Sequence, residues 1–152
     1  MNKPGKDIMI VRDLGFSLLA EGRILKIKAD GYSMYPSIKP GTTIFIETLA
    51  ENKILLPGEI IAWKRESGFV VHRFARSEYK GNEVFYYTRG DSCIREDEPV
   101  TRDQIAGKVI RTEDRKGRIK EGDKMITKPC NFTNRIIVRL LLFIHRSGYY
   151  LF

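Results

Sequence analysis

Residues 31–38 read Gly-Tyr-Ser-Met-Tyr-Pro-Ser-Ile and predict a tight turn that carries a serine, Ser33. Glycine permits a sharp bend and proline fixes the backbone φ angle, so this turn can hold the serine side chain exposed. Residues 23–30 alternate apolar and polar side chains and predict a strand leading into the turn. Ser33 is therefore either an ordinary turn residue or a nucleophile that needs a neighbouring base.

The same pattern of strand and turn repeats outward through the middle of the chain. Further short strands are predicted at residues 42–48, 59–65, 68–79, 83–89, 106–112 and 118–120. Glycine-containing turns, Lys80-Gly81-Asn82 and Lys116-Gly117, connect the last two pairs. Many short strands with regular turn signals are typical of a β-barrel or β-sandwich. We therefore predict a mainly β fold, a curled barrel or sandwich with a short helix at each end.

The helix at the beginning is predicted over residues 7–21. Gly22 follows it and suits the first position beyond a helix C-terminus. The 3.6-residue period places four apolar side chains on one face, Val11, Leu14, Leu18 and Leu19.

The second helix is predicted over residues 134–152, with Arg135, Arg139 and Arg146 opposite an apolar face. Such a basic amphipathic helix either lies in a membrane interface or packs on the β-domain with its arginines in water. The net charge of +8 favours an anionic partner, and so the membrane surface. No basic recognition helix or aromatic ribonucleoprotein signature is found, so no nucleic-acid partner is predicted.

Length and composition predict one globular domain over residues 1–152, made of an N-terminal helix (1–22), a β core (23–120) and the C-terminal helix (134–152). The apolar run at residues 8–11 is too short for a signal peptide, and no apolar run approaches the ~20 residues of a membrane span.

Cys93 and Cys130 lack metal-ligand spacing to each other or to His72 and His145. We expect two free thiols, no metal, no cofactor, and a cytoplasmic or peripheral membrane location.

Further motifs follow the Ser33 turn in a defined order. Residues 70–74 read Val-Val-His-Arg-Phe, residues 90–91 read Gly-Asp, residues 97–100 read Asp-Glu-Pro-Val, and residues 104–109 read Gln-Ile-Ala-Gly-Lys-Val. This order resembles the type I signal peptidase superfamily, which also contains self-cleaving repressors. Histidine stands where bacterial signal peptidases and repressors use lysine, so the archaeal and endoplasmic-reticulum branch is the most similar. The resemblance covers roughly residues 22–112.

The resemblance implies that Ser33 is a nucleophile and that His72 is its base. His72 shares a predicted strand face with apolar residues, a pattern that is also typical of a buried structural histidine. Paired with Ser33, a neutral imidazole would accept the hydroxyl proton and return it to the leaving amine. Lys64 is the competing base, because relatives use lysine, but it falls in the preceding strand.

One aspartate is expected to orient His72. Asp91 is the first choice and Asp97 the second, although an aspartate after glycine is also common in an ordinary turn. The Ser33 amide is the expected oxyanion donor. Met34 and Pro36 are expected to shape the turn and line a substrate groove. Cys93 lacks a turn motif of its own and is the weaker nucleophile candidate.

These features predict a serine endopeptidase that binds an extended peptide along a strand edge. The resemblance implies small residues at the first and third positions before the cut. Signal peptidases are membrane-tethered, and this sequence departs from them in lacking a predicted span. Two alternatives are a non-catalytic, membrane-associated binding module and a self-cleaving regulator. The second would need a DNA-binding module, for which the 30 residues ahead of the motif are short.

Overall fold

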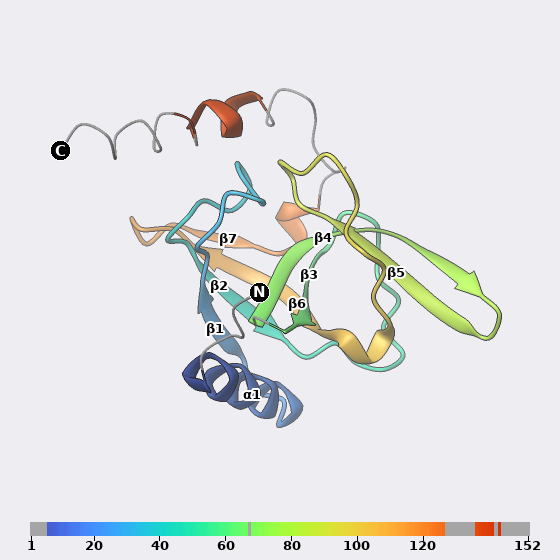
Figure 1. Cartoon of the computed structure of the whole chain (residues 1–152). Coiled ribbons are helices and arrows are strands. Elements are labelled where there is room, and N and C mark those ends of the chain that lie inside the picture. Colours follow the sequence, from blue (N-terminus) through green and yellow to red (C-terminus); the bar gives the residue numbers. More distant parts are fainter. Residues whose placement is uncertain (1–5, 67, 127–135, 142, 144–152) are drawn as a thin grey trace.

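The computed structural model describes residues 6–66, 68–126, 136–141 and 143. One seven-stranded antiparallel sheet forms the centre of the molecule, in the order β1-β2-β6-β3-β4-β5 with β7 paired to β6 (Figure 1). Its strands are β1 (Leu25–Lys28), β2 (Thr43–Glu47), β3 (Ile60–Arg65), β4 (Gly68–Lys80), β5 (Glu83–Arg89), β6 (Ile105–Glu113) and β7 (Ile119–Glu121). The remaining elements are helix α1 (Lys6–Ala20) and the 3₁₀ turns η1 (Arg102–Gln104) and η2 (Asp123–Met125).

The prediction of a mainly β fold is confirmed, and the predicted strands lie within two residues of the observed ones. The sheet does not close into a barrel, since β1 and β5 stand at opposite ends of the strand order. Gly81 and Gly117 occupy the predicted turns with positive φ angles of 64° and 75°. Such angles favour glycine, which explains why the turn signals were readable from sequence.

Helix α1 ends as predicted, but its buried face differs from the predicted one. Gly22 has a φ of 73°, and its amide donates a hydrogen bond to the Leu19 carbonyl. Leu19 is buried, whereas Leu14 is 59% exposed, so the prediction for Leu14 was wrong. The helix approaches the sheet closely at Gly15, where an added methyl group would lie 3.2 Å from the Phe69 ring. This contact turns the side of α1 that bears Leu14 towards solvent. The side chain of Val11 lies outside the described residues.

Both faces of the central sheet are covered, and β3 contributes to two separate cores. Ile60 and Ala62 belong to one core with Leu19, Met34, Ile38, Ile44, Ile46, Val109 and Met125. Ile61 and Trp63 point to the other face and pack with Leu49, Leu55, Phe74, Val100 and Ile105. Successive side chains of a strand point to opposite faces, so a continuous apolar run fits a strand buried on both sides.

The segment Gly107-Lys108-Val109 of β6 fixes the centre of the sheet. Val109 is buried in the first core, and the Lys108 ammonium pairs with the buried Glu59 carboxylate. Gly107 lies opposite Ala62 in the ladder, where β6 passes from its pairing with β3 to its pairing with β2. A methyl group added at Gly107 would lie 2.2 Å from the Glu47 carbonyl oxygen. The backbones therefore approach as closely here as glycine alone allows.

The predicted C-terminal helix is partly described. Residues 136–141 and 143 are helical and lie on the side of the sheet opposite α1 (Figure 1). The remaining positions of the predicted helix over 134–152 lie outside the described residues. Within the described part of the chain, no helix combines the length and apolar character needed to cross a membrane.

We expect Gly107→Ala to destabilise the protein by roughly 1–3 kcal/mol, because the added methyl group overlaps the Glu47 carbonyl and the backbone must move. Gly31→Ala is the matched control, since its nearest atom is 4.0 Å away. Thermal melts of the two variants measure the difference. Equal melting temperatures would contradict the close approach of β6 and β2.

Candidate functional site

The turn over residues 31–38 is held from both sides by hydrogen bonds. Within the turn, the Tyr35 amide donates to the Tyr32 carbonyl and the Ile38 amide to the Met34 carbonyl. From the loop after β5, the Ser92 amide donates to the Ser33 carbonyl at 2.9 Å, and the Ser92 hydroxyl lies 3.0 Å from the same oxygen. The backbone of Ser33 is thus fixed by a loop nearly sixty residues further along the chain.

His72 lies on β4 and is oriented by Asp97, not by Asp91. The His72 Nδ1 atom is 2.7 Å from Asp97 Oδ2, and the two side chains are 10% and 21% exposed. Thr88 donates to the same carboxylate oxygen at 2.5 Å, and Trp63 Nε1 donates to the Thr88 hydroxyl at 3.1 Å. Because a carboxylate only accepts hydrogen bonds, Nδ1 carries the proton. In neutral His72, Nε2 is then the acceptor.

The Nε2 side of His72 faces the place where the Ser33 turn meets the loop after β5. A methyl group added at Gly90 would lie 2.6 Å from the Ser33 carbonyl oxygen, 2.7 Å from Cys93 Sγ and 3.1 Å from His72 Nε2. These three groups therefore converge on the same point. Glycine at position 90 leaves the space that lets them approach one another. The free imidazole nitrogen is thus next to the backbone of Ser33.

Asp91 has a different partner from the expected one. Its carboxylate accepts from Arg73 Nε at 2.7 Å and from Arg73 Nη2 at 2.8 Å, and both residues are almost completely buried. A planar guanidinium matches a carboxylate in this two-point geometry. The first choice of Asp91 as the partner of His72 was wrong. Arg73, the residue after His72, is buried, and its guanidinium takes the Asp91 carboxylate as its own partner. Asp97, the second choice, contacts the ring instead.

Arg73 also ties the site to the rest of the fold. Its Nη1 donates to the carbonyls of Gly58 and Met125, each at 2.6 Å, and its Nη2 donates to the Ser37 hydroxyl at 3.1 Å. The sequence motifs assigned no role to Arg73. Its neighbours on the same face of the predicted strand, Val71 and Ala75, are apolar, and this pattern could have indicated a buried arginine. A buried guanidinium needs a carboxylate and further acceptors.

Ser33 and His72 line one cavity of about 360 Å³ between β1 and β4. Met34 lines the same cavity, while its side chain is buried in the first core. Pro36 is exposed and lines neither cavity beside Ser33. A second cavity, of about 420 Å³, also borders Ser33 and is lined in part by residues from the C-terminal helix.

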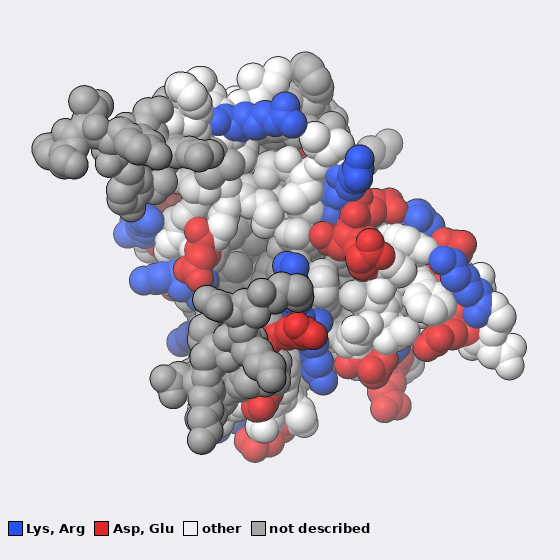
Figure 2. All heavy atoms as spheres, in the orientation of Figure 1, with Lys and Arg blue, Asp and Glu red and all other residues white. Residues whose placement is uncertain are grey.

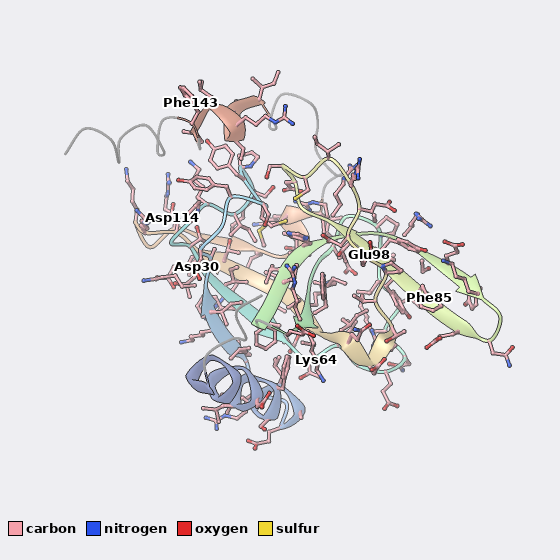
Figure 3. All side chains as sticks on the ribbon, viewed as in Figure 1. Asp30, Lys64, Phe85, Glu98, Asp114 and Phe143 are labelled. Carbon is pink, nitrogen blue, oxygen red and sulfur yellow. The ribbon has the colours of Figure 1, made fainter. Side chains whose placement is uncertain are left out.

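Lys64, the competing base, lies away from this cavity. Its ammonium is 4.7 Å from the centre of the Phe16 ring on α1, and its side chain is exposed. Figure 3 shows Lys64 at the end of the sheet beside α1. The geometry therefore favours His72 over Lys64 as the base.

Cys93, the weaker nucleophile candidate, lies close to Ser33 and His72. It is a free thiol next to Gly90, and burial, followed by the negative charge of Asp97, raises its pKa above the usual value. A raised pKa keeps the thiol protonated and therefore a weak nucleophile. Cys130 lies outside the described residues. Within the described ranges, no group of His, Cys, Asp and Glu is placed to hold a metal ion.

The arrangement is one that can carry out acyl transfer: a serine in a fixed turn, and a histidine whose one nitrogen is held by a carboxylate while the other is free to accept a proton. The chain matches no protein-family model and no curated protein sequence.

We expect Asp91→Asn and Arg73→Met each to destabilise the protein by about 3–5 kcal/mol, because each leaves a buried polar or charged partner unpaired. The double variant Arg73→Met/Asp91→Asn should lose much less stability than the sum of the two single changes. Urea unfolding measures all three. The control is Arg76→Met, whose exposed pairing with Glu96 should matter little. Additive losses from the two single changes would contradict the coupling.

Proposed function

We propose that this protein is a serine endopeptidase of the signal peptidase type, with Ser33 as nucleophile, His72 as base and Asp97 as its orienting residue. The observation that carries the proposal is the position of His72. Asp97 holds Nδ1, and Nε2 faces the fixed turn that bears Ser33. The order of the sequence motifs supports the same assignment.

In the proposed mechanism, the Ser33 hydroxyl attacks the carbonyl carbon of a peptide bond while His72 Nε2 takes its proton. Asp97 stabilises the imidazolium that forms, and Thr88 and Trp63 hold that carboxylate in place. The imidazolium then protonates the leaving amine, and a covalent acyl-enzyme on Ser33 remains. Water, activated by the same imidazole, releases the second product. We assign stabilisation of the oxyanion to the Ser33 amide.

Two free strand edges support binding of an extended peptide. Among the described residues, β1 pairs only with β2, and the first five residues of β4 pair only with β3, because β5 joins β4 from Arg73 onward. Both edges line the cavity that contains Ser33 and His72. A peptide laid between them would gain main-chain hydrogen bonds from either side. The carbonyl of its last residue before the cut would lie at Ser33.

The cavity that contains Ser33 and His72 has an apolar floor. Met34, Ile38, Ile44 and Val71 form this floor, and the first three of these are core residues. The preference for small residues before the cut comes from the resemblance.

We expect Ser33→Ala and His72→Ala each to lower turnover of a peptide with small residues before the cut by on the order of 10⁴–10⁶. Asp97→Asn should lower it by on the order of 10⁴, because Nδ1 loses its acceptor. Lys64→Ala and Cys93→Ala are the controls and should retain most of the activity. Peptide cleavage measured by chromatography, with thermal melts of each variant, checks the ranking.

Labelling with a fluorophosphonate separates this function from its alternatives. The proposal requires a covalent adduct on Ser33 that His72→Ala prevents. A folded protein without any adduct would be a binding module instead. Loss of activity in Cys93→Ala would transfer the nucleophile role to the thiol, and loss in Lys64→Ala would transfer the base role. A self-cleaving regulator would shorten on incubation alone, whereas we expect the chain to stay intact.

We also propose that the C-terminal helical residues attach the protein to anionic membrane surfaces. Val138 faces the body of the protein and is buried, whereas Ile136, Ile137, Leu140 and Phe143 are 44–69% exposed. Their spacing places Ile136, Leu140 and Phe143 on one helix face. An exposed apolar helix face, in a chain with a net charge of +8, suits the interface of an anionic bilayer.

We expect the double variant Ile136→Glu/Leu140→Glu to bind anionic phospholipid vesicles more than about tenfold more weakly than the unaltered chain. The matched control is Ile54→Glu/Leu56→Glu, which makes the same charge change at two exposed apolar residues elsewhere. Co-sedimentation with vesicles measures binding, and added salt should weaken it. If both double variants lose vesicle binding equally, the effect comes from net charge, and the helix has no specific role in membrane binding.

A further inference from the structure

Ser33 borders two cavities, and the second of these has no role in the function proposed so far. Gly31 and Ser33 line both cavities, so both cavities border the proposed nucleophile. A peptide that fills the first cavity with the residues before its scissile bond would direct the following residues into the second. In this arrangement, the first cavity binds the residues before the cut and the second cavity binds the residues after it.

The C-terminal helix forms a wall of the second cavity. Val138, only 6% exposed, and Arg139 line it together with Ile94 and Ser92 from the loop after β5. Figure 1 shows helical residues 136–141 above the turn and loop that contribute the other walls. In Figure 2 the same region of the surface is mainly uncharged, with one long basic side chain across it.

The lining defines the chemistry of a ligand. Tyr32, Ile94 and Val138 make the cavity mainly apolar, and its volume of about 420 Å³ suits a large side chain. Arg139 is exposed on the same wall and supplies a positive charge. Ser92 adds little polarity to the cavity, because its hydroxyl already donates to the carbonyls of Tyr32 and Ser33.

We propose that this second cavity, lined on one side by the chain's own C-terminal helix, is the leaving-group subsite of the peptidase. It binds a large apolar side chain immediately after the scissile bond, and Arg139 favours an acidic residue at the next position. This inference rests on the proposed function and adds a selection on the far side of the cut. Val138 and Arg139 are then specificity-determining residues, more than forty positions beyond Asp97 in the sequence.

The test uses the full chain and peptides that are identical before the cut. The first position after the cut is Gly, Ala, Leu or Phe, and the second is Asp or Lys. We expect kcat/KM to be at least about tenfold higher for Leu and Phe than for Gly, a typical gain from filling an apolar pocket. Asp should be preferred to Lys at the second position.

Two variants assign these preferences to the cavity. Val138→Trp, which fills it, should lower the ratio of kcat/KM for Leu over Gly by about tenfold, whereas Ile137→Trp on the adjacent exposed position should leave that ratio unchanged. Arg139→Glu should invert the Asp over Lys preference. Because Arg139 is exposed, Arg139→Glu still tests the inference if Val138→Trp destabilises the protein.

The outcomes separate this inference from the proposed function. If peptides are cut without either preference, or if Val138→Trp and Ile137→Trp alter the Leu over Gly ratio equally, the subsite assignment is overturned and the peptidase stands. If no peptide is cut and Ser33 resists a fluorophosphonate, the peptidase and the subsite fall together.

Discussion

The buried guanidinium of Arg73 is the interaction on which the rest of the site depends. Its five N–H donors are all used, and they connect segments that are far apart in sequence: Asp91, Ser37, Gly58 and Met125. A buried arginine is tolerated only when its charge is paired and its donors are satisfied. The turn that carries Ser33 and the loop that carries Asp91 must therefore keep one relative position, or this charge loses its partners.

This constraint explains how the candidate catalytic groups are held without belonging to one element. His72 and Arg73 are neighbours on β4, yet one contacts Asp97 and the other Asp91, on successive parts of the same loop. The Asp91 pair fixes the loop, and Ser92, the next residue, fixes the Ser33 carbonyl. The loop then presents Asp97 to the imidazole. Structural and proposed catalytic roles are thus divided between two adjacent side chains and two nearby carboxylates.

Much of the fold could be predicted from sequence, because apolar alternation and turn glycines are local signals. The strands, the two hairpin turns and the end of α1 at Gly22 follow from them. What failed depended on tertiary contacts. Leu14 faces solvent because α1 approaches the sheet at Gly15, and Asp91 was assigned to the wrong neighbour because motif order does not tell which carboxylate a buried arginine takes. The cavity beneath Val138 depends on the path of the chain and had no local signal.

Among the described residues, β1 pairs only with β2, and this open edge matters for the protein even without a bound peptide. An unpaired strand edge attracts the strands of other molecules, including further copies of the same chain, and so promotes aggregation. This strand is only four residues long, and two of them, Lys26 and Lys28, are exposed. Two copies that met edge to edge would bring these like charges together. The short, lysine-bearing strand therefore disfavours edge-to-edge pairing of two copies, while its main-chain groups stay available to the peptide that is proposed to bind there.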